Sequence, residues 1–135
     1  MDLETRIRAS FGRQSMMQTL GARLISVAPG AVTIEAAIRP DLHQQLGYAH
    51  AALAFAIGDS AAGYSALTVT PEDKEIVTSE MKIHLLAPAV GDRLIARGRV
   101  IRPGRRLVIV SADVYAVKDG RETHAALLTG TTVPV

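Results

Sequence analysis

The chain has 135 residues, of which 48% are hydrophobic and 21% charged, and its formal net charge is +2. This composition indicates a single globular domain over residues 1–135 and excludes a disordered chain. The absence of cysteine excludes disulfides, thiolate metal ligands and cysteine nucleophiles. We find neither a signal peptide nor an uninterrupted apolar run of about 18 residues, so we expect a cytoplasmic protein without a membrane span.

The N-terminal part of the chain predicts a helix followed by two paired strands. Apolar residues at every fourth position indicate a helix over 2–11. Strand-like runs follow over 20–28 and 31–39, and the turn signal Pro29-Gly30 between them predicts a hairpin.

The remainder predicts one long apolar helix, over about 49–67, and then only strands. The expected strands cover residues 75–86, 92–102, 106–117 and 122–133. Hairpin signals, Pro103-Gly104 and Asp119-Gly120, separate the last three. A long helix followed by an antiparallel meander predicts an α+β fold in which the sheet wraps around the helix.

Asp59 is the most informative residue of the long helix. It is the only acidic residue between Asp41 and Glu72, and it lies in a run, Gly47 to Leu67, with eight alanines and three glycines. A carboxylate in such surroundings loses much of its hydration, which is unfavourable unless the group is paired or protonated. We therefore interpret Asp59 first as a catalytic residue and second as a structural one.

The segment from Leu42 to Asp59 resembles the signature of hotdog-fold acyl-CoA thioesterases of the PaaI type. That signature has an Asn, a Gly, a His-Gly-Gly triplet and an acidic residue nine positions after the His, and Gly47, His50 and Asp59 keep its spacing. Residues 78–92 resemble the family's next strand and its Pro-Ala-x-Gly-Asp turn. The resemblance implies a hotdog fold that hydrolyses an acyl-CoA thioester and needs no cofactor, because CoA is part of the substrate. His43, His84 and His124 show no metal-ligand spacing, so a metal site is not expected.

The resemblance also implies roles for individual residues. Asp59 would be the catalytic carboxylate, acting either as nucleophile or as general base on water. The Ala51 N–H would bind the thioester carbonyl as an oxyanion donor at the helix N-terminus. Gln44 stands at the family's Asn position and would orient the water or the acyl group, and Thr78 would support the carboxylate or the water. Gly47 and His50 would contact substrate.

Two departures from the family pattern concern these residues. Gln44 in place of Asn reaches one methylene further. Ala51-Ala52 replaces Gly-Gly, which keeps the N–H donors but adds two methyl groups beside the acyl channel. If the first of these positions required a positive φ, alanine would be strained there, whereas a helical conformation would suit it.

The spacing of Ala51 and Asp59 predicts a dimer. Eight residues along a helix span about 12 Å, whereas an oxyanion donor and an attacking group must both lie near one carbonyl. If both act, they come from different chains, with two helices side by side in a symmetric dimer, or in a dimer of two such dimers. The small helix residues that would allow this approach are Ala54, Gly58, Ala61 and Ala62.

Arginines cluster between residues 93 and 106, six within 14 positions. Arg102, Arg105 and Arg106 flank the Pro103-Gly104 turn, and the thioesterase interpretation predicts that they bind the phosphates of CoA. The alternative is a solvated strand face. A nucleic acid partner is not expected, because few aromatic residues are available for stacking.

Other interpretations remain open at this point. His50 lies on the opposite helix face from Asp59, which disfavours a His–Asp dehydratase site, and a helix-start histidine can simply bond to backbone. A non-catalytic acyl-CoA-binding protein of the same fold is the main alternative to an enzyme. Tyr48, Phe55 and Tyr64 are candidates for lining an acyl pocket or for core packing.

Overall fold

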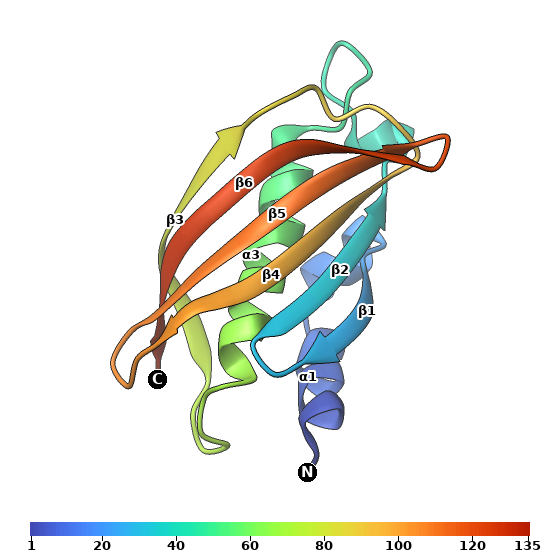
Figure 1. Cartoon of the computed structure of the whole chain (residues 1–135). Coiled ribbons are helices and arrows are strands. Elements are labelled where there is room, and N and C mark those ends of the chain that lie inside the picture. Colours follow the sequence, from blue (N-terminus) through green and yellow to red (C-terminus); the bar gives the residue numbers. More distant parts are fainter.

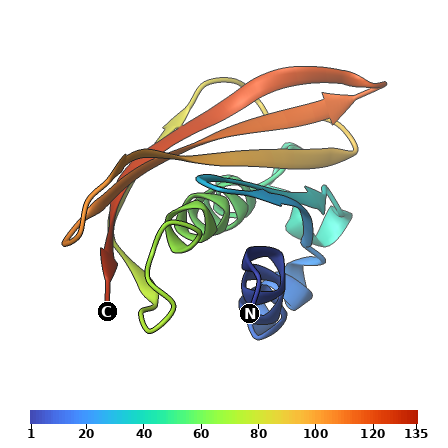
Figure 2. The ribbon, with the colours of Figure 1, turned by 60° about the horizontal axis from the view of Figure 1, so that its bottom comes forward.

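The computed structural model describes residues 1–135 as one antiparallel sheet curved around a long helix (Figure 1). The helices are α1 (Leu3–Gly12), α2 (Ser15–Leu20) and α3 (Ala51–Leu67), with a short 3-10 turn at Pro40–Leu42. The strands are β1 (Arg23–Ala28), β2 (Ala31–Ala37), β3 (Ile76–Leu85), β4 (Arg93–Pro103), β5 (Val108–Lys118) and β6 (Arg121–Pro134). Figure 2 shows the sheet arched over α3, with α1 beside α3. None of the helices is long and apolar enough to cross a membrane.

The predicted α+β hotdog architecture is confirmed, but the strand order corrects the predicted meander. The order across the sheet is β1-β2-β4-β5-β6-β3. Strands β4, β5 and β6 form consecutive hairpins, whereas β3 crosses over to pair with β6 and becomes an edge strand. The turn at Asp119-Gly120 has positive φ at both residues, 51° and 75°, as the predicted hairpin requires.

The N-terminal region contains a helix that the sequence analysis missed. Leu20 was expected to begin a strand, but it is the last residue of α2 and is buried together with Met17. Gly21 ends that helix in the left-handed conformation, with φ 68°, and β1 begins only at Arg23. Gly21 is therefore the residue in the sequence that indicates the end of this helix, because helices commonly end at a glycine in the left-handed conformation.

Small residues of α3 bring the helix close to its own sheet. A Cβ at Gly58 would lie 2.8 Å from Leu128 Cδ1, and a Cβ at Gly98 of β4 would lie 2.3 Å from the Ala61 carbonyl oxygen. Ala54, Gly58, Ala61 and Ala62 are all buried there. The expectation that these four residues face a partner helix is therefore wrong. The small residues of α3 that are at least partly exposed are Ala51, Ala52, Ala56, Ser60 and Gly63.

Candidate active site

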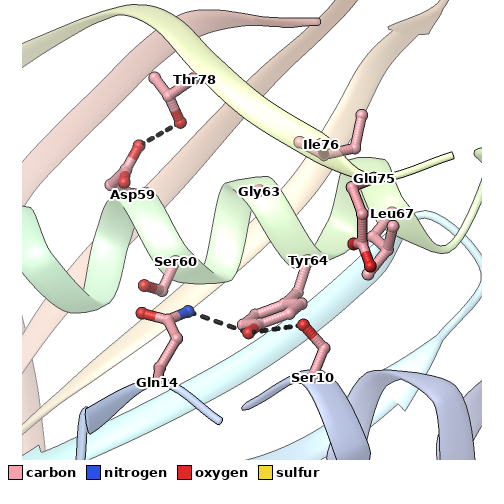
Figure 3. Close-up of a pocket in the computed structure, with 10 residues that line it drawn as sticks. All are labelled: Ser10, Gln14, Asp59, Ser60, Gly63, Tyr64, Leu67, Glu75, Ile76 and Thr78. Carbon is pink, nitrogen blue, oxygen red and sulfur yellow. Dashed lines mark hydrogen bonds between the residues drawn. The ribbon is translucent and has the colours of Figure 1, made fainter. Parts of the chain in front are cut away.

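Asp59 lies near the middle of α3, where the helix faces the edge strand β3. The Thr78 hydroxyl donates a hydrogen bond of 2.8 Å to Asp59 Oδ1, so the predicted support of the carboxylate is present (Figure 3). Burial raises the pKa of Asp59 above its ordinary value, and the hydrogen bond from Thr78 acts in the opposite direction. A half-buried carboxylate with a raised pKa, held by one hydroxyl, is suited to accept a proton.

A pocket of about 280 Å³ opens beside Asp59. Its ten lining residues, three of them hydrophobic, are Ser10, Gln14, Asp59, Ser60, Gly63, Tyr64, Leu67, Glu75, Ile76 and Thr78. Figure 3 shows Asp59 and Thr78 on one side of α3 and a hydrogen-bonded group of Tyr64, Gln14 and Ser10 on the other. Of the aromatic candidates, Tyr64 thus lines the pocket while its ring also packs against Phe11.

The N-terminus of α3 offers one free backbone donor. His50 is the residue before the helix, and its Nδ1 accepts a hydrogen bond of 2.9 Å from the Ala52 N–H. The Ala51 N–H forms no hydrogen bond within the chain. Ala51 is helical rather than positive in φ, so alanine is not strained there. The backbone-bonding role considered for His50 is therefore the observed one.

The loop before α3 is shaped by Gln44 and Gly47. The Gln44 side-chain oxygen accepts hydrogen bonds from the N–H groups of Leu46 and Tyr48, which leaves its NH₂ group without a partner in the chain. Gly47 has a φ of 82°, which favours glycine, and it is exposed and lines no large pocket. The structure therefore gives both residues a role in building the loop.

A second pocket, of about 370 Å³, adjoins the free Ala51 amide. Ten of its thirteen lining residues are hydrophobic, and they include Tyr48, Ala51 and residues of the segment after β3. Gln44 and His50 also line it. Neither Asp59 nor Thr78 lines this pocket. Within one chain, the structure thus brings Asp59 together with Thr78, and Ala51 together with Gln44 and His50, but it keeps the two groups apart.

The arginine cluster divides into two groups. Arg93, Arg97 and Arg99 form ion pairs with Glu35, Glu122 and Asp113, respectively, so this half of the cluster is a paired strand face. Arg102, Arg105 and Arg106 lie at the β4–β5 turn, are exposed, and form no ion pair. Only this second group is available to an anionic ligand.

Comparison with known proteins gives the family. The model of the thioesterase superfamily matches residues 46–123. A solved structure of a thioesterase family protein from Silicibacter pomeroyi is 37% identical, with a TM-score of 0.97 over 99% of this chain and 98% of that one. The chain belongs to the thioesterase superfamily. The hotdog-fold, PaaI-like resemblance is thereby confirmed.

Other relatives agree with this assignment. The PaaI protein of the E. coli phenylacetic acid degradation operon has the same fold, with a TM-score of 0.87 at 19% identity over 98% of this chain and 93% of that one. A 1,4-dihydroxy-2-naphthoyl-CoA hydrolase of Listeria monocytogenes is 23% identical over 83% of this chain and 87% of its own length. A protein of Saccharolobus solfataricus that is named as an esterase is 34% identical over 64% of this chain. The match covers 55% of that protein's length, so this chain spans about half of it.

The sequence analysis missed the contribution of the N-terminal helices to the Asp59 pocket. Ser10 and Gln14 reach this pocket because Arg6 fixes α1 against the C-terminal end of α3. Its guanidinium donates to the carbonyls of Leu67, Thr70, Pro71 and Lys74, at 2.8 to 3.3 Å. No local sequence pattern indicates these contacts, because the partners lie more than 60 residues away.

Proposed function

We propose that the protein hydrolyses an acyl-CoA thioester and that Asp59 activates the attacking water. The observation that carries this proposal is the Asp59 carboxylate, with its raised pKa and its Thr78 partner, in a pocket large enough for an acyl group. Membership of the thioesterase superfamily supports the reaction class. The CoA hydrolase among the relatives supports CoA as the thiol carrier.

The reaction uses a base and an oxyanion donor. Asp59 takes a proton from water as the water oxygen bonds to the thioester carbon, and the Ala51 N–H binds the negative oxygen that develops. Collapse of the tetrahedral intermediate breaks the C–S bond, and the proton passes from Asp59 to the departing sulfur. The products are a free acid and CoA. Direct attack by Asp59, followed by hydrolysis of the resulting anhydride, uses the same groups.

Each complete site requires two chains. Ala51 and Asp59 are separated by about 12 Å along α3 and line different pockets, so one chain cannot supply both groups to one carbonyl. The edge strand β3 has a free side and exposed apolar residues, Val77 at 50% and Leu85 at 60% exposure. Edge pairing of two β3 strands would form a symmetric dimer and bring the exposed sides of two α3 helices together.

The free arginines at the β4–β5 turn provide a site for the nucleotide end of CoA. Arg102, Arg105 and Arg106 are exposed and have no acidic partner, and clustered guanidinium groups bind phosphates bidentately. Phosphate binding here would contribute to the affinity for substrate without touching the reacting atoms.

The decisive experiment measures thiol release from a panel of acyl-CoAs by the wild type and by Asp59→Asn. The substitution keeps the shape and removes the base, so we expect a loss of at least about 100-fold in kcat. Asp73→Asn, at an exposed loop carboxylate without an ion pair, is the matched control and should leave kcat unchanged. If neither protein hydrolyses any ester while both bind CoA esters, a non-catalytic binding protein replaces the proposed enzyme.

A further inference from the structure

Phe55 is the one large apolar side chain of α3 that the fold leaves exposed, at 36%. It lines neither of the two pockets and is not part of the hydrophobic core, so neither role considered for it, acyl-pocket lining or core packing, is observed. We propose that Phe55 lies on the two-fold axis of the dimer. There it contacts its own copy and holds the two chains in the register that catalysis needs.

The composite site determines where this axis passes along the helix. If Ala51 of each chain serves the Asp59 of the other, the two-fold axis exchanges these positions, and the two α3 helices run antiparallel. In such a pair, the residue midway between the exchanged positions faces its own copy. Phe55 is four residues after Ala51 and four before Asp59, so it is that residue. The inference rests on the proposed function, because it takes the composite site as its starting point.

Phe55 also lies on the side of the helix that this arrangement requires. Residues four apart are neighbours on a helix surface, so Ala51, Phe55 and Asp59 follow one another along one side of α3. All three are at least partly exposed, whereas Ala54 and Gly58 are buried against the sheet. The side that carries the oxyanion donor and the base therefore carries the aromatic ring between them.

The dimensions of packed helices allow this contact. Packed helices lie about 8–10 Å apart from axis to axis, and each Cα atom stands about 2.3 Å from its own axis. At the upper end of this range, two Cα atoms that face each other are about 5 Å apart. The small residues beside Phe55 on the helix surface, Ala52 and Ala56, leave room for the ring of the partner chain.

This placement makes Phe55 a positioning residue. The two reaction centres lie on either side of it, each about 6 Å along the helix from the axis, so its ring touches no reacting atom. The place where the helices cross sets the distance from each Ala51 amide to the partner's Asp59. A slip of one residue would move donor and base by about 1.5 Å, and a misplacement of about 1 Å can lower the rate about 100-fold.

The test places charges on the axis. Because a residue on a two-fold axis faces its own copy, Phe55→Asp opposes two negative charges and Phe55→Lys two positive ones. We expect each variant alone to raise the dissociation constant of the dimer at least about 100-fold and to lose hydrolysis with it, since like charges across an interface are strongly unfavourable. An equimolar mixture pairs opposite charges and should recover both dimers and thiol release. Analytical ultracentrifugation and thiol release measure the two effects, and circular dichroism checks folding.

Val69 provides a matched control for the charged variants. It is 40% exposed, similar to Phe55, but it lies beyond the C-terminal end of α3 and 14 positions from Phe55. Val69→Asp and Val69→Lys should each remain dimeric and active.

A cross-link tests the axis without adding charge and covers charged variants that do not fold. Phe55→Cys introduces a thiol into a chain without cysteine, so any disulfide joins two copies. Mild oxidation should link this variant. Ser60→Cys should stay unlinked, because ten residues would separate its two copies, about 15 Å along the helices, whereas a disulfide joins Cα atoms less than about 7 Å apart.

The outcomes separate this inference from the function on which it rests. If the charged variants stay dimeric and active alone, Phe55 lies outside the interface and the inference is overturned, while hydrolysis that depends on Asp59 leaves the proposed function intact. If each variant dissociates but the mixture does not recover, Phe55 lies off the axis and the register is wrong. If wild-type hydrolysis does not depend on Asp59, the proposed function fails, and the cross-link still shows whether the axis passes Phe55.

Discussion

The division of each site between two chains predicts that two inactive variants restore activity when they are combined. The first variant is Asp59→Asn, which lacks the base. The second is Ala51→Pro, which lacks the oxyanion donor because proline has no backbone N–H. We expect these variants to lose at least about 100-fold and about 10²–10³-fold in kcat, respectively.

Ala51→Pro is well tolerated at this position. Ala51 is the first residue of α3, where proline is favoured, and its N–H has no partner within the chain. His50 already has φ −62° and ψ 141°, the extended conformation that a residue before proline prefers. The substitution therefore removes one donor and leaves the helix intact, which circular dichroism and thermal unfolding should verify.

The expected recovery follows from symmetry. In a heterodimer of the two variants, one site combines the intact Ala51 of one chain with the intact Asp59 of the other, and the second site lacks both. Random exchange makes half of the dimers mixed, and half of their sites are intact, so the mixture should reach about one quarter of wild-type activity. Purified heterodimers, isolated through two different tags, should reach about one half.

The assay is thiol release after subunit exchange, with each variant alone as the baseline. A mixture that contains heterodimers but stays at this baseline would refute the composite site. It would show either that Ala51 is not the oxyanion donor or that the chain supplies both groups to one site after a rearrangement. The separation of about 12 Å along a rigid helix makes the second explanation physically costly.

Three further predictions concern single features of the structure. Thr78→Val removes the hydrogen bond that lowers the pKa of Asp59, so this pKa should rise further and the acid limb of the kcat/KM profile should move to higher pH. Replacement of Arg105 and Arg106 by alanine should raise KM with little change in kcat. The control Arg121→Ala, at the β5–β6 hairpin, should change neither. An unchanged KM in the double variant would show that these arginines do not bind the phosphates of CoA. Gly98→Ala should lower the free energy of unfolding in urea by about 1–3 kcal/mol, because its Cβ would overlap the carbonyl of the helix beneath β4.

The sequence predicted the architecture well where the signals were local. The long helix and the Asp119-Gly120 hairpin were found because apolar runs and turn residues act over a few positions. The neighbour of β3 was not found, because pairing with β6 connects segments about 50 residues apart and nothing in β3 itself specifies this partner. Short α2 was also missed, since six residues give too few turns for a periodic pattern.

The site was predicted only in part, for a physical reason. Asp59 was identifiable because a lone carboxylate in an alanine-rich helix requires an explanation, and the family resemblance supplied its pairing with Thr78. The face of α3 that packs against the sheet was predicted wrongly, because small residues occur all around this helix and periodicity cannot separate its sides. Ser10 and Gln14 gave no signal, since their roles depend on the distant contacts of Arg6.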